Sequence, residues 1–227
     1  MWFKAVLWGL WLFFSVKPVW AGDVKGRVEF AGERPKEQWV QVQKDREVCG
    51  EWRPLERILL SPEGRLANVL VELQGVQTKD PVHDHRIAVL DNRDCRFIPR
   101  VQITPLGSML EIRNSDATLH TAHAYRKRDV TVFHVALPHF REQVRVSLDT
   151  PGLLQIVCDV GHVWMRAYIF VTDNPFVTAT DSQGRFALKG VPPGTYRLQV
   201  WHEVLGTLSR RVTVPDEGTA VVVLRYP

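Results

Sequence analysis

The feature that most constrains the fold is the alternation of apolar and polar residues in short segments. An apolar or small side chain stands at every second position in residues 24–30, 67–73, 144–148, 196–200 and 212–214. A period of two places those side chains on one face of a strand. Proline and glycine residues, as at Pro151-Gly152 and Pro193-Gly194, separate the segments with turns. This spacing predicts an all-β chain of antiparallel β-sandwiches.

The composition excludes several other architectures and one class of partner. Of the 227 residues, 45% are hydrophobic and 24% are charged, which is typical of a globular protein with a buried core rather than a disordered, collagen-like or coiled-coil chain. The formal net charge is +4, but Lys4 and Lys17 lie in the first 21 residues, which contain no acidic residue. The rest of the chain is nearly neutral, so we expect no nucleic-acid partner.

Residues 1–21 have the pattern of a secretory signal peptide. Lys4 precedes an apolar run over 5–16, Pro18 ends that run, and Ala21 stands at the −1 position of a cleavage site. A membrane anchor is the alternative, but a spanning helix needs about 20 apolar residues. We therefore expect cleavage after Ala21, a periplasmic or secreted protein, and no stable membrane insertion.

The three cysteines gain meaning from this export signal. Disulfides persist in oxidising compartments, so Cys49 and Cys95 can pair and leave Cys158 as the one free thiol. Closing a loop of about 46 residues would stabilise the fold by roughly 4 kcal/mol in the chain-entropy picture.

Segment 158–165 combines several metal-ligand types in one loop between two predicted strands. Cys158, His162 and Met165 lie in this loop, and His120 follows an upstream strand. Two imidazoles, one thiolate and a weak axial thioether form the ligand set of an electron-transfer copper site. The alternative is structural: Cys158 is then a buried thiol, Met165 belongs to the core and His162 is a loop residue.

These residues resemble the cupredoxin family of plastocyanin-like blue copper proteins, over roughly residues 87–172. The segment from Asn114 to His120 resembles the one that brings the family's first histidine ligand. The resemblance implies a Greek-key β-sandwich with one mononuclear type-1 copper. The ligands that it implies are His120, Cys158, His162 and, as the long axial ligand, Met165.

The resemblance also implies a surrounding layer of residues that support the ligands. Asn114 begins the first ligand segment, and Trp164 is an apolar wall within the second, or simply packing. Thr121 stands where the family usually has an Asn that joins the two ligand loops. A binuclear copper centre would join Cys49 or Cys95 to Cys158, but it normally takes both thiolates from one loop, so we favour the disulfide.

A second resemblance covers the end of the chain. Residues 178–200 are similar to the transthyretin-like domain called carboxypeptidase regulatory-like, which implies a small β-sandwich without catalytic residues. The matching residues are Asp181, Gly184, Phe186, Pro193, Gly194 and Tyr196. Residues 173–227 are too few for such a sandwich, so we expect its missing strands in 22–78, near 23–31 and 66–74. Residues 32–57 are predicted to be a long loop, and the cupredoxin domain, 79–172, is then an insertion.

Together these features predict an exported type-1 copper protein that carries single electrons between periplasmic redox partners. A periplasmic copper-binding or delivery protein and a metal-free β-sandwich binding module are the alternatives. We expect no enzyme, because no Ser-His-Asp order, phosphate-binding loop, dinucleotide fingerprint or pair of catalytic carboxylates stands out.

Overall fold

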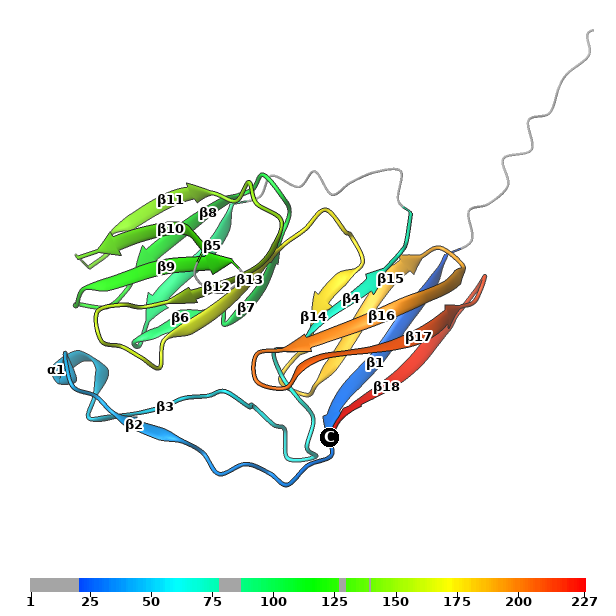
Figure 1. The fold of residues 1–227 in the computed structure, drawn as a ribbon, viewed down its shortest axis with the longest axis horizontal. Coiled ribbons are helices and arrows are strands. Elements are labelled where there is room, and N and C mark those ends of the chain that lie inside the picture. The colour runs from blue at the N-terminus through cyan, green and yellow to red at the C-terminus, as the bar shows by residue number, and fades with distance from the viewer. Residues whose placement is uncertain (1–20, 78–86, 127–129, 139) are drawn as a thin grey trace, which may run out of the picture.

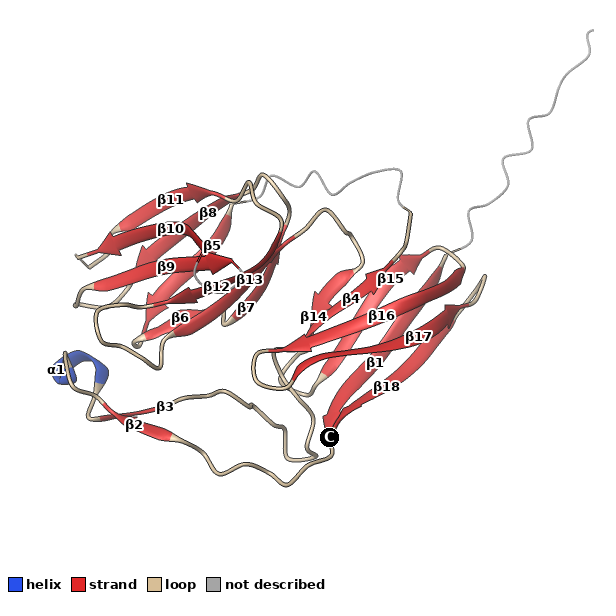
Figure 2. Ribbon diagram, in the orientation of Figure 1, coloured by secondary structure: helices blue, strands red, loops and turns tan. Residues whose placement is uncertain are grey.

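The protein is seen in a computed structural model that describes residues 21–77, 87–126, 130–138 and 140–227 (Figure 1). The described chain forms two β-sandwiches and a single four-residue helix (Figure 2), which confirms the all-β prediction. The expected signal peptide lies outside the described residues except for Ala21. No helix in the described ranges is long and apolar enough to cross a membrane.

The first sandwich packs a five-stranded sheet against a four-stranded one. Their strand orders are β10-β9-β12-β13-β7 and β11-β8-β5-β6. The strands are β5 (Ala88–Arg93), β6 (Arg96–Ile98), β7 (Val101–Thr104), β8 (Met109–Asn114), β9 (His120–Arg126), β10 (Val130–Leu137), β11 (Gln143–Ser147), β12 (Gly152–Val157) and β13 (Arg166–Val171). Fully buried Leu90, Ile112 and Ile156 belong to the core between the sheets.

The second sandwich takes strands from both ends of the chain. Its sheets have the orders β15-β1-β18 and β14-β4-β16-β17. The strands are β1 (Gly22–Phe30), β4 (Leu70–Gln74), β14 (Val177–Ala179), β15 (Arg185–Val191), β16 (Gly194–His202), β17 (Gly206–Val214) and β18 (Thr219–Tyr226). Val28 and Val71 are fully buried in one core with Val200. The first sandwich is therefore inserted in the chain between β4 and β14.

Residues 38–55, which we call the arm, extend from the second sandwich to the first (Figure 1). The arm consists of the paired strands β2 (Trp39–Gln41) and β3 (Trp52–Pro54), with helix α1 (Arg46–Cys49) between them. Sequence patterning predicted a loop here because the segment is highly charged. The structure differs because Val42 and Cys49 are buried in the core of the first sandwich. Their burial holds the tip of the arm against that sandwich.

Three strand pairs are parallel, against the antiparallel prediction. They are β1 with β18, β5 with β8, and β7 with β13. Alternation of side chains reports which face of a strand is buried and carries no information on the direction of its neighbour. Each parallel pair joins strands far apart in sequence, as such pairs require.

Candidate metal site

The candidate ligands meet at one end of the five-stranded sheet. Strands β9 and β12 pair up to His123, which lies opposite Val157, the last residue of β12. The residues of β9 before His123 therefore extend past the end of β12. The chain leaving β12 turns there through Cys158 and His162 before β13 begins at Arg166. This register brings His120 next to the loop, although 38 residues separate it from Cys158.

Three donor atoms of this cluster face one another. The Nδ1 atoms of His120 and His162 are 3.2 Å apart, and each faces the Sγ atom of Cys158, at 3.9 and 3.7 Å respectively. Both histidines are 0% exposed and Cys158 is 5% exposed. The arrangement is a small, buried triangle of two nitrogen atoms and one sulfur atom.

The triangle has the dimensions that a metal ion requires. A point equidistant from its three corners lies about 2.1 Å from each, within the range of bonds from histidine nitrogen and cysteine sulfur to a divalent ion such as zinc, about 2.0–2.3 Å. Soft sulfur together with imidazole suits copper. The residues present fit a copper ion, and the buried cluster resembles a type-1 copper site.

Met165 lies in the same loop and the same buried cluster. Its side chain is 1% exposed, and its backbone N–H donates to the carbonyl oxygen of His162 at 2.9 Å, which closes the loop before β13. Met165 thus belongs to the same buried core cluster as Cys158.

A carboxylate supports each histidine from behind. The Nε2 atom of His120 lies 2.9 Å from Oδ2 of Asp116, and that of His162 lies 3.0 Å from Oδ2 of Asp45. A carboxylate only accepts, so Nε2 carries the proton in both rings. The Nδ1 atoms are then directed into the triangle, which is how carboxylates orient metal-binding histidines.

The electrostatics of the site favour an ion pair between the imidazolium of His120 and the thiolate of Cys158. Burial alone lowers the pKa of His120, but the hydrogen bond to Asp116 and the neighbouring Cys158 outweigh it and raise that pKa to about 9. Burial raises the pKa of Cys158, but its contacts with His120 and His162 outweigh burial and lower the pKa to about 6. The sulfur of Cys158 is therefore a thiolate at neutral pH, the form that binds metals.

Thr121 joins the two ligand segments. Its backbone N–H points at Sγ of Cys158 from 3.5 Å, and its hydroxyl oxygen accepts the backbone N–H of Asp159 at 2.8 Å. The hydroxyl also lies 3.8 Å from Sγ of Cys158. Thr121 thus connects the segment that carries His120 to the loop that carries Cys158.

Asn114 and Trp164 position the loops around the ligands. The side-chain amide of Asn114 donates to the carbonyl oxygens of Thr118 and Leu137 at 2.8 and 2.9 Å, which fixes the turn that precedes His120. Trp164 is 4% exposed and its ring centre lies 5.2 Å from that of His162. The indole N–H donates to the carbonyl oxygen of Cys95 at 2.9 Å.

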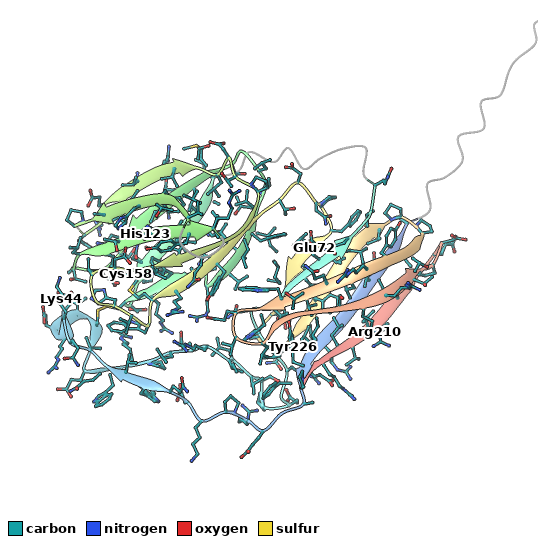
Figure 3. The ribbon with its side chains drawn as sticks, viewed as in Figure 1. Lys44, Glu72, His123, Cys158, Arg210 and Tyr226 are labelled. Carbon is teal, nitrogen blue, oxygen red and sulfur yellow. A yellow bond between two sulfur atoms is a disulfide. The ribbon has the colours of Figure 1, made fainter. Side chains whose placement is uncertain are left out.

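The arm completes the site from outside. Cys49 and Cys95 form the expected disulfide, with a Cα–Cα distance of 5.5 Å, and it joins the arm to the first sandwich. The arm's tip, marked by Lys44 in Figure 3, lies beside the end of the sandwich that carries Cys158. Asp45 on this tip contacts His162, which explains why that histidine is fully buried.

Sequence reasoning missed both supporting carboxylates. Asp116 had a local signal, because it stands four residues before His120 in the same segment, and it also accepts the backbone N–H groups of Asp94 and Cys95. Asp45 had none, because 117 residues separate it from His162 and only the folded arm brings it there.

Comparison with known families gives one partial match. Residues 159–226 match the carboxypeptidase regulatory-like domain family. The match begins inside the ligand loop and includes β13, whereas the second sandwich consists of β1, β4 and β14 to β18. No curated protein matches the chain in sequence.

Similar solved structures include copper proteins. The copper-containing nitrite reductase of Thermus scotoductus SA-01 is 20% identical, with a TM-score of 0.33; the match covers 43% of this chain and 25% of that one. A purple cupredoxin from Nitrosopumilus maritimus is 15% identical, with a TM-score of 0.32; the match covers 37% of this chain and 99% of that one. A reduced amicyanin variant is 13% identical, with a TM-score of 0.34; the match covers 46% of this chain and 98% of that one. The chain thus spans a quarter of the nitrite reductase.

Proposed function

We propose that this chain is an exported type-1 copper protein that transfers single electrons between periplasmic redox partners. His120, Cys158 and His162 are the strong ligands in this proposal, and Met165 is the weak axial one. When bound, the copper ion supplies a one-electron redox couple. The observation that carries the proposal is the buried triangle of two Nδ1 atoms and one Sγ atom, with edges of 3.2 to 3.9 Å.

The protein's part in electron transfer is to keep this geometry constant. Hydrogen bonds through Nε2 fix both imidazole rings, and Thr121 fixes the start of the loop at Cys158. Strands β12 and β13 bound the loop on either side. A site that moves little between oxidation states exchanges electrons with little reorganisation, which is the demand of this function.

Burial distinguishes electron transfer from copper delivery. A delivery protein must present its ligands to a receiving site, whereas the four side chains here are between 0% and 5% exposed. The arm additionally covers His162. These features support retention of the ion over its handover.

Export is supported by the disulfide between Cys49 and Cys95. Such bonds persist in oxidising compartments and are rare in the cytosol. Together with the signal-peptide pattern of residues 1–21, this leads us to propose a periplasmic protein.

Copper loading with a matched pair of variants tests the proposed function. The Cu(II)-loaded protein should show an intense visible thiolate-to-copper band and a reversible one-electron couple. His120→Asn should abolish the band, because a strong ligand is lost, whereas His202→Asn, which replaces a histidine of the second sandwich that is 2% exposed, should retain it. Cys158→Ser should also abolish it. A band that survives either ligand substitution contradicts the assignment, and tight Cu(I) binding without a reversible couple would favour delivery.

A further inference from the structure

A second group of metal-ligand side chains lies on the outer face of the five-stranded sheet. His123 on β9 and His134 on β10 are direct partners in the antiparallel register. Asp159, the residue that follows Cys158, contacts both. Figure 3 labels His123 and Cys158 close together in the first sandwich. This group lies outside the copper triangle, because alternation along β9 turns His123 away from the face that carries buried Ala122 and Ala124.

The contacts within the group converge on one carboxylate oxygen. Oδ2 of Asp159 lies 2.6 Å from Nδ1 of His123 and 3.4 Å from Nε2 of His134. The two imidazole rings are stacked, with centroids 4.1 Å apart and planes 7° from parallel. One potential ligand atom from each residue lies within 4.8 Å of the other two.

The nitrogen of His123 that faces Asp159 has a second oxygen neighbour. The hydroxyl group of Tyr125 lies 2.7 Å from the same Nδ1 atom. Nδ1 of His123 thus faces two oxygen atoms at the point where the three side chains converge.

We propose that His123, His134 and Asp159 bind a second metal ion, a divalent transition metal with Cu(II) as the strongest binder. Two imidazole nitrogens and one carboxylate oxygen, without thiolate, suit borderline divalent ions, and Cu(II) leads the affinity order among them. The side chains of His134 and Asp159 are 47% and 39% exposed, so water completes the coordination. This exposure also gives the ring of His134 room to rotate until its nitrogen points at the same ion as Nδ1 of His123.

The fold fixes the backbone of Asp159 and the side chain of His123. The backbone N–H of Asp159 donates to Thr121, and Nε2 of His123 lies 2.8 Å from the hydroxyl oxygen of Thr131 on β10. His123 is only 14% exposed. Binding therefore has to order chiefly the side chain of His134. This site does not depend on the proposed electron-transfer function, because it shares no ligand with the copper triangle.

Titration of the full chain with Cu(II), followed by electron spin resonance and visible absorption, tests this site. Two equivalents should bind, and the second should give a nitrogen–oxygen signal without an intense visible band. His134→Asn should remove that second signal and leave the visible band unchanged. Asp159→Asn, which retains the backbone bond to Thr121, should weaken it at least tenfold. As a control, His202→Asn, which replaces a histidine of the second sandwich, should retain both.

Cys158→Ser separates this proposal from the function proposed above. The variant should lose the visible band and still bind one equivalent with the nitrogen–oxygen signal. Wild-type protein that binds a single equivalent, or a second equivalent that survives His134→Asn, would overturn the second site. Loss of the second signal in His202→Asn would place the second ion elsewhere in the chain and also overturn the proposal.

Discussion

At the residue scale, the two candidate ligand histidines depend on carboxylates of very different origin. Asp116 belongs to the turn before β9 and is itself fixed by two backbone N–H groups, so its bond to His120 is part of the first sandwich. Asp45 belongs to the arm, and its bond to His162 exists only while the arm is docked. The ring of His120 is therefore oriented by the first sandwich itself, and that of His162 by the arm, which the disulfide joins to that sandwich.

The ion pair between His120 and Cys158 predicts how copper affinity varies with pH. The pKa of His120 is raised to about 9, so below that pH an incoming ion must displace its proton, whereas Cys158, with a pKa lowered to about 6, has already lost its own proton above pH 6. For this pair, apparent affinity should rise about tenfold per pH unit between those values, because one proton is released. It should level off above pH 9 and fall more steeply below pH 6.

Competition with a chelator of known proton affinity, at several pH values, measures this slope. Calorimetry in buffers of different ionisation enthalpy counts the released protons independently. A copper affinity that is constant from pH 6 to pH 9 would contradict the ion pair.

Met165 should tune the copper potential without carrying the colour. Met165→Leu removes a weak donor that stabilises Cu(II) more than Cu(I), and the swap conserves volume in a buried position. The band should persist, and the potential should rise by about 60 mV or more, which corresponds to at least a tenfold loss of relative Cu(II) affinity. Voltammetry measures the shift. Met109→Leu on β8, at a methionine that is 37% exposed, should leave the potential unchanged; an equal shift in both variants would remove Met165 from the ligand set.

At the element scale, sequence identified the loop between β12 and β13 but could not reveal the arm. Cys158, His162 and Met165 fall within one short loop, so the sequence shows them as one short motif. His120 begins β9, which is adjacent to β12 in the sheet. Asp45 reaches the site through a docking contact that no local pattern encodes. The parallel strand pairs were not predicted for a related reason. Alternation shows which face of a strand is buried and does not show the direction of the neighbouring strand.

Removal of the disulfide should uncouple the arm from the site. Cys49→Ala with Cys95→Ala opens a loop of about 46 residues and should cost up to about 4 kcal/mol of unfolding free energy. It should also speed copper loss, because Asp45 no longer holds His162. Asp45→Asn keeps the disulfide and should weaken copper binding about 10- to 100-fold while largely sparing stability. Denaturation and copper-release kinetics separate the two effects. Unchanged copper release in both variants would show that the arm does not support the site.

At the scale of the whole molecule, the two sandwiches meet through a compact polar contact. Arg100 and Glu203 form an ion pair at 2.7 Å, with side chains 12% and 8% exposed. The hydroxyl of Tyr168 donates to Glu203 at 3.1 Å, and its ring lies edge-on to Trp201 with centroids 5.0 Å apart. Burial, followed by the charge of Glu203, raises the pKa of Tyr168 to about 12. The contact joins β13, which bounds the ligand loop, to the end of β16.

The insertion predicts that the end of the chain does not fold alone. Residues 173–227 lack β1, which lies between β15 and β18, and β4, which lies between β14 and β16. Both missing strands are central, so their removal exposes unpaired strand edges and the apolar core around Val200 and Leu198. The isolated segment should give the circular dichroism of an unfolded chain and no cooperative transition, and addition of residues 21–77 by fusion should restore strand content. A cooperative unfolding transition in residues 173–227 alone would show that the second sandwich is independent of the strands that precede the copper site.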